Sequence, residues 1–131
     1  MVNDPVGDFI IRLKNASAVR AEFVSLPYSK FKFAVASKLA QRGYVKSVAK
    51  RGKKIRKTLE VELAYGKGGQ PTISEVKRIS KPGRRLYRNV SEIYPVRYGK
   101  GLLLLSTPKG VLTGDEAKKE KTGGEALFDI W

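Results

Sequence analysis

The residues with the clearest binding chemistry lie in one short loop. Ser106, Thr107, Lys109 and Gly110 follow directly on the four leucines of residues 102–105. Hydroxyl groups donate and accept at short range, so they fit base edges and ribose 2′-hydroxyls better than bulk phosphate. The lysine adds positive charge, and the glycine permits close backbone approach. The loop therefore favours hydrogen-bonded recognition of RNA. An equally weighted alternative is that it is a strand-to-helix turn that binds no partner.

Two basic segments are further candidates for contact with nucleic acid. Residues 42–57 carry eight Lys or Arg and no acidic residue, which is typical of a patch that binds phosphates without reading sequence. Lys57 lies at the edge of this segment. The alternative is that the segment is only the solvated tip of a hairpin and binds no phosphate. The second segment surrounds Tyr87, whose ring can stack on a base or a sugar or can simply pack on a sheet. Its cationic candidates are Lys81, Arg84, Arg85 and Arg88.

Catalytic and metal chemistry have little support. The chain has no His and no Cys, which removes the usual general base near neutral pH, thiolate nucleophiles and nearly all zinc sites. Acidic pairs such as Asp4 and Asp8 stand at expected helix starts, where carboxylates stabilise the positive end of the helix dipole. We expect no enzyme activity, no cofactor and no metal. A carboxylate-dependent nuclease is the remaining enzymatic alternative.

The net charge narrows the class of partner. Of 131 residues, 27 are Lys or Arg and 12 are Asp or Glu, which gives +15 and a pI near 10.2. Such a field attracts polyanions, so nucleic acid is the first expectation and anionic membrane the rival. The longest apolar run is too short to span a bilayer, and the first residues do not resemble a signal peptide. We expect a soluble cytoplasmic protein without a membrane partner.

The first half of the chain predicts helices and a hairpin. Asp4 and Pro5 are typical of a helix start, and apolar residues at helical spacing predict a helix over residues 5–16. Alternation over residues 22–28 predicts a strand, and Ser29 is a suitable cap for a helix that ends at Gly43. The segments 44–50 and 55–63 then predict a hairpin with a basic tip. We expect an N-terminal domain over residues 1–63.

A connector and a mainly β domain follow. Residues 64–71 contain three glycines and a proline, a composition typical of a linker; a phosphate-binding nest is the alternative. Over residues 72–131 we expect a second hairpin about the Lys-Pro-Gly turn at 81–83 and a strand at 101–107 buried on both faces. Thr113 and Glu116 predict a capping box that opens a short helix, which Gly123 and Gly124 would end before a last strand. The fold class is α/β (α+β) with two small domains.

Four segments together resemble a known family. They are "NDPVGDFIIRLKNA", "RISKPGRRLY", "LLLLSTPKGVLTGDEAKK" and "GGEALFDIW". In order and spacing they are similar to bacterial small-subunit ribosomal protein eight, the universal S-eight family. The resemblance spans the chain, and its most specific element is the Ser-Thr-x-Lys-Gly loop. Pro108 departs from the family, which usually has serine there, so one contact of that hydroxyl or its N–H is expected to be lost.

The resemblance implies a structural constituent of the small ribosomal subunit. It implies a primary ribosomal RNA binder that recognises a bulged stem in the central domain, aids assembly and, in some members, represses translation through its own mRNA. Implied partners also include neighbouring ribosomal proteins, protein five among them, in a cytoplasmic or organellar ribosome. A basic architectural or anionic-membrane module is the alternative. The family's RNA contacts map onto Ser106, Thr107, Lys109, Gly110, Gly123, Gly124 and Glu125, and more loosely onto Arg85 and Tyr87. Weaker candidates for RNA or protein contacts are Asp4, Arg12, Asn15 and Lys30.

Overall fold

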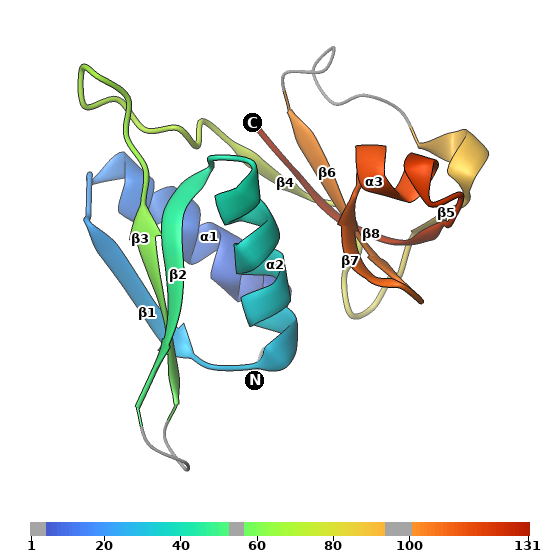
Figure 1. The fold of residues 1–131 in the computed structure, drawn as a ribbon, viewed down its shortest axis with the longest axis horizontal. Coiled ribbons are helices and arrows are strands. Elements are labelled where there is room, and N and C mark those ends of the chain that lie inside the picture. The colour runs from blue at the N-terminus through green and yellow to red at the C-terminus, as the bar shows by residue number, and fades with distance from the viewer. Residues whose placement is uncertain (1–4, 53–56, 94–100) are drawn as a thin grey trace. The chain divides into compact units, whose positions relative to one another are not determined.

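The protein combines helices with antiparallel sheets in two compact units (Figure 1). The computed structural model describes residues 5–52, 57–93 and 101–131. One unit is Asp8–Ser74, and the other is Glu75–Trp131 together with residues 5–7. The expected α+β class with two small domains is confirmed, whereas the exact domain boundaries stay a prediction.

The first part of the chain forms a three-stranded sheet with two helices. Figure 1 shows both helices on one side of this sheet, whose strand order is β1-β3-β2. The elements are α1 (Pro5–Ala18), β1 (Phe23–Pro27), α2 (Lys30–Gln41), β2 (Val45–Arg51) and β3 (Thr58–Leu63). All of the elements predicted for this part are present, because each has a strong local signal.

The local signals act as expected in these elements. Ser29 caps α2, since its hydroxyl accepts a hydrogen bond from the Lys32 N–H at 3.1 Å. Along β3, Leu59, Val61 and Leu63 are buried while the intervening residues stay partly exposed. This period-two alternation buries one face of the sheet and leaves the other to solvent.

The glycine-rich segment after β3 is a hydrogen-bonded loop of the first unit. Its ends approach in a bridge between Tyr65 and Pro71, and the Gly66 N–H donates to the Gln70 carbonyl at 2.8 Å. Tyr65 donates its hydroxyl to the Ala21 carbonyl, and Arg20 Nε donates to the Gly69 carbonyl at 2.8 Å. The loop is therefore tied to the turn between α1 and β1.

The second unit is a five-stranded antiparallel sheet with short helical segments. The strand order is β4-β8-β6-β7, and β5 also pairs with β8. Figure 1 shows α3 beside β6 and β7. The elements are β4 (Val76–Arg78), β5 (Tyr87–Arg88), the 3₁₀ helix η1 (Val90–Glu92), β6 (Leu102–Thr107), β7 (Gly110–Thr113), α3 (Gly114–Lys119) and β8 (Gly124–Ile130).

The second predicted hairpin is wrong in its pairing. The turn itself is present, since Lys81 and Arg84 exchange backbone hydrogen bonds of 3.0 and 2.9 Å. However, β4 and β5 do not pair with each other: Val76 is opposite Ile130, and Tyr87 is opposite Glu125. Both strands use successive stretches of β8 instead. Local turn chemistry predicts the reversal of the chain but not the strand that each arm joins.

Strand β6 is the centre of the second unit. Leu102 to Leu105 are all buried, so the predicted burial on both faces is confirmed. Leu103 and Leu105 pack in a cluster with Ile93, Ala117 and Ala126. Residues alternate across a strand, so the other two leucines point to the opposite face, where their pairing partners on β8 are buried too. A strand held on both faces is a rigid support for the loop that follows it.

The segment after β6 differs from expectation in two respects. Thr107 leads into a tight hairpin with β7, so the loop does not run directly into a helix. The predicted capping box of Thr113 and Glu116 is confirmed at the start of α3, but α3 ends at Lys119, well before the two glycines. Gly123 and Gly124 belong to the entry of β8. They allow neighbouring backbone segments to pack closely. The sequence signals that mark helix ends do not predict this role.

Candidate nucleic-acid interface

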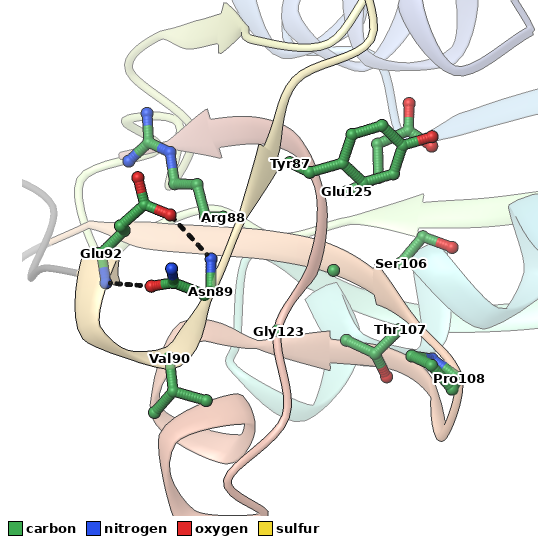
Figure 2. A pocket seen from close by; sticks show the side chains of 11 residues that line it. Tyr87, Arg88, Asn89, Val90, Glu92, Ser106, Thr107, Pro108, Gly123 and Glu125 are labelled. Atoms are coloured by element: carbon green, nitrogen blue, oxygen red, sulfur yellow. Dashed lines mark hydrogen bonds between the residues drawn. The ribbon is translucent and has the colours of Figure 1, made fainter.

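A pocket in the second unit gathers most of the residues predicted from the loop and the chain end. Figure 2 shows these side chains around the opening between the start of β8, the end of β6 and the segment from β5 to η1. The lining residues are Tyr87, Arg88, Asn89, Val90, Glu92, Ser106, Thr107, Pro108, Gly123, Gly124 and Glu125. Three separate stretches of sequence therefore meet in one place.

One row of side chains crosses three strands at this pocket. Tyr87 on β5 is directly opposite Glu125 on β8, and Glu125 is directly opposite Ser106 on β6. Directly opposed residues of antiparallel strands project from the same face of the sheet. Tyr87 is 68% exposed. The row therefore offers an aromatic ring, a carboxylate and a hydroxyl side by side (Figure 2).

The Glu125 carboxylate is held by partners from the turn between β4 and β5. Its Oε2 atom accepts hydrogen bonds from Ser80 Oγ at 2.6 Å and from Arg85 Nη1 at 3.0 Å. Burial alone would raise the pKa of Glu125, but these hydrogen bonds and the charges of Arg85 and Arg78 outweigh it and lower that pKa below its usual value. Glu125 is therefore ionised at neutral pH within a strongly cationic protein.

The two glycines let three backbones come together at the pocket floor. A Cβ atom on Gly123 would lie 2.8 Å from Asn89 Cα, and one on Gly124 would lie 2.9 Å from the Ser106 carbonyl carbon. These neighbours are main-chain atoms, which cannot rotate away as a side chain can. Only glycine fits at either position, so the floor presents bare backbone.

The tip of the β6–β7 hairpin is ordered by Thr107. Its hydroxyl donates to the Gly110 carbonyl at 2.7 Å and accepts from the Lys109 N–H at 3.1 Å. Pro108 takes the first central position of the turn, where its fixed φ is suitable, and Gly110 has a φ of +107°. The hydroxyl of Thr107 is thus already engaged within the turn, whereas that of Ser106 makes no hydrogen bond to any residue the structure describes.

Lys109 points back to the end of α3. Its Nζ lies 3.3 Å from Glu120 Oε2 and 3.3 Å from the Glu120 carbonyl oxygen. Both side chains are more than half exposed, and such surface pairs contribute little to stability. The ion pair therefore braces the hairpin tip only weakly, and Lys109 can exchange Glu120 for an anionic ligand.

The remaining predicted residues fall outside the pocket. Lys81 and Arg84 form the exposed Lys-Pro-Gly turn, and Arg85 is committed to Glu125. Asp4 lies outside the described residues. Arg12 pairs with Asp8 at 3.2 Å on α1. Exposed positions in the first unit are occupied by Asn15, Lys30 and Lys57.

The basic hairpin of residues 42–57 is partly neutralised by acidic residues of β3. Lys46 Nζ lies 3.4 Å from Glu62 Oε2, and Arg51 Nε lies 3.5 Å from Glu60 Oε1. Residues 53–56 at its tip lie outside the described residues. Charge counting along the sequence overstates the field at this patch, because the compensating carboxylates belong to the neighbouring strand.

Sequence reasoning missed three residues of the pocket and one that supports it. Asn89, Val90 and Glu92 line the pocket, and the buried Ser80 holds Glu125. One signal was available: Asn89 and Glu92 form a reciprocal capping box around η1, with the spacing that such boxes have. The other residues belong to the pocket only through contacts between distant segments.

This arrangement suits hydrogen bonding and stacking on a nucleic acid. A ring, an acceptor carboxylate, a free hydroxyl and bare backbone can meet unpaired bases and riboses. Within the described residues, no cluster of three or more metal-ligating side chains occurs. No helix in the same part of the chain is both long and apolar enough to cross a membrane.

Comparison with known proteins shows the family of the chain. Residues 4–131 match the family described as Ribosomal protein S8. The small ribosomal subunit protein uS8 of Helicobacter pylori strain Shi470 is 41% identical over 131 residues and covers all of both chains. That of Rubrobacter xylanophilus is 41% identical over 130 residues, which is 99% of this chain and 98% of the relative. The chain therefore belongs to the ribosomal protein S8 family, a family of ribosomal structural proteins and not of enzymes.

Proposed function

We propose that the protein binds ribosomal RNA in the small subunit and recognises a bulged stem of the central domain through the pocket of its second unit. In this role it is a primary binder that aids subunit assembly in the cytoplasmic ribosome. Membership of the family supports the ribosomal setting. The bulged stem is favoured because regular A-form helices expose little sequence to a protein, whereas unpaired bases can be stacked and hydrogen-bonded.

The single observation that carries this proposal is the row of Tyr87, Glu125 and Ser106 across three paired strands. Polar groups fixed on a sheet are positioned more accurately than groups on a free loop. Cationic residues elsewhere, Lys57 among them, would supply phosphate contacts that add affinity without selecting a sequence.

The test compares two RNAs of equal length at physiological salt, one with an internal bulge from the central domain and one fully paired. We expect tight binding of the first and weak binding of the second. Equal affinity for both would leave only non-specific charge attraction, which fits the alternative of a basic architectural module. Sedimentation of the protein with anionic vesicles tests the alternative of a membrane-surface protein. Co-sedimentation would favour that alternative.

The domain division predicts where the selectivity resides. We propose that residues 71–131 fold alone and retain most of the preference for the bulged stem, while residues 1–64 retain little. Chemical-shift dispersion reports folding of each fragment, and titration reports binding. An unfolded C-terminal fragment would indicate that the two halves depend on one another.

Two further partners belong to the same proposal. An mRNA stem of similar shape would meet the same pocket, so translational repression through the protein's own message is expected to be lost with the same variants. Neighbouring ribosomal proteins, protein five among them, would contact the first unit, where Arg12, Asn15 and Lys30 are exposed. Protection of those side chains from labelling in the assembled subunit would test this contact.

A further inference from the structure

The carboxylate of Glu125 is an unusual group to find in a site for a polyanion. The protein carries a net charge of +15, and a negative side chain at the pocket repels phosphate. Besides pairing with Ser80 and Arg85, it can accept hydrogen bonds from the ligand, as carboxylates do from base amino groups or from ribose hydroxyls. How well the Glu125 carboxylate accepts such hydrogen bonds depends on whether it is ionised and on where its oxygen atoms point.

Ser80 holds this carboxylate from outside the pocket. Its side chain is fully buried at 0% exposure. The Ser80 hydroxyl donates to Glu125 Oε2 at 2.6 Å and accepts from the Leu86 N–H at 3.0 Å. Because Leu86 directly precedes Tyr87, this one hydroxyl links the strand that carries the aromatic ring to the carboxylate opposite it.

Arg85 completes the arrangement on the same oxygen. Its Nη1 lies 3.0 Å from Glu125 Oε2, so both hydrogen bonds meet at one carboxylate oxygen. Among the described residues, none donates to Oε1. With Oε2 fixed, the carboxylate cannot rotate freely, and Oε1 remains as an acceptor with a defined position.

We infer that Ser80, assisted by Arg85, is the positioning residue of the RNA site: it fixes Glu125 Oε2 so that Oε1 accepts a hydrogen bond from a base amino group or a ribose hydroxyl. This inference rests on the proposed function and deepens it. Ser80 itself touches no RNA and acts only through Glu125. Arg85, which the resemblance assigns to RNA contact, serves here as a partner of the carboxylate.

The test is a double-mutant cycle with Ser80→Ala, Glu125→Ala and the double variant, measured with the bulged stem. Each single change should lower affinity about tenfold, the equivalent of about 1.4 kcal/mol. If Ser80 acts through Glu125, the double variant should bind like Glu125→Ala alone, because coupled residues are not additive. Additive losses would overturn the inference.

A matched control exists in the first unit. Ser47 Oγ also donates to a glutamate, at 3.1 Å from Glu62 Oε1, and Glu62 likewise has a cationic partner, Lys46. Ser47→Ala should leave affinity for the bulged stem unchanged. An equal loss with Ser47→Ala would show a general effect of removing such pairs and would overturn the assignment to Ser80.

A second readout needs no RNA. Carbon-detected titration of the Glu125 carboxyl should show a higher pKa in Ser80→Ala than in the wild type, since that hydroxyl stabilises the charged form. The other groups near this carboxylate, Arg78, Arg85, Tyr87 and Ser106, are unchanged by the substitution. An unchanged pKa in a folded variant would overturn the inference, whereas wild-type protein that does not prefer the bulged stem would overturn the proposed function alone.

Discussion

Gly124 on β8 lies against the Ser106 carbonyl on β6 so closely that no side chain fits between them. A Cβ atom on Gly124 would stand 2.9 Å from the Ser106 carbonyl carbon and 3.0 Å from Thr107 Cα. The two strands can therefore pair at the edge of the pocket only because this residue is glycine. The same approach brings Ser106 alongside Glu125.

Gly124→Ala should destabilise the protein by about 1–3 kcal/mol, the usual range for overpacking, and should weaken binding of the bulged stem. Chemical denaturation measures the first effect and titration the second. Gly83→Ala is the control, since a Cβ atom there meets nothing within 4 Å. A Gly124→Ala protein as stable as Gly83→Ala would show that the strands can separate without cost.

Thr107→Ala should weaken binding of the bulged stem by about 0.5–1.5 kcal/mol, the net contribution of a typical hydrogen bond. The reason is that the hydroxyl holds the Lys109 N–H and the Gly110 carbonyl in the turn. The dependence of affinity on salt should not change, because no charge is removed. Thr107→Ser keeps the hydroxyl and should bind like the wild type; full affinity of the alanine variant would mean that the turn is not part of the interface.

Pro108→Ser tests the position at which the chain departs from its family. The change restores a hydroxyl and an N–H at the exposed turn, but it also frees the φ angle that proline fixes. We expect tighter binding of the bulged stem if a contact has been lost with the proline. Unchanged or weaker binding, measured by the same titration, would indicate that rigidity of the turn compensates for the missing contact.

Lys57→Ala should weaken binding of every RNA alike and should lower the slope of log affinity against log salt by about one, as expected for one phosphate contact. Lys57 is exposed and forms no ion pair with the residues described. Lys46→Ala is the comparison, because that ammonium is already paired with Glu62 and should change the slope less. A selective loss for the bulged stem would assign Lys57 to recognition instead.

The pH dependence of stability should separate two carboxylates. The pKa of Glu125 is lowered from 4.5, so its stabilising contribution is present above that value and is lost as pH falls through the folded pKa. Burial raises the pKa of Asp129 above 3.8, although the charges of Arg88 and Lys77 act in the opposite direction. The ionised form of Asp129 therefore destabilises the folded state, and protonation removes this effect.

Unfolding free energies of Glu125→Gln and Asp129→Asn, followed from pH 7 to pH 3, check these signs. Glu125→Gln should be less stable than the wild type at pH 7, with a difference that shrinks as pH falls. The ionisation of Asp129 has the opposite effect on stability. The stability of Asp129→Asn relative to the wild type should therefore be highest at pH 7. The same pH trend in both variants would contradict the opposite shifts.

Sequence alone determined the features that depend on neighbouring residues. The caps at Ser29 and Thr113, the turn at residues 81–84 and the buried leucines of β6 all follow from propensity and spacing within one element. The family could likewise be recognised from ordered motifs along the chain. Each of these signals lies within a few residues of the structure that it predicts.

Tertiary structure alone decided which of these elements meet. Strands pair through backbone hydrogen bonds, which every residue type except proline can both donate and accept. Nothing in the local pattern therefore showed that β4 and β5 both join β8. Glu125 is held by Ser80 and Arg85, which lie 45 and 40 residues away along the chain. The need for Gly124 arises from a carbonyl on another strand. The sequence could therefore name most residues of the candidate site, but their shared face and their partners exist only once distant strands have paired.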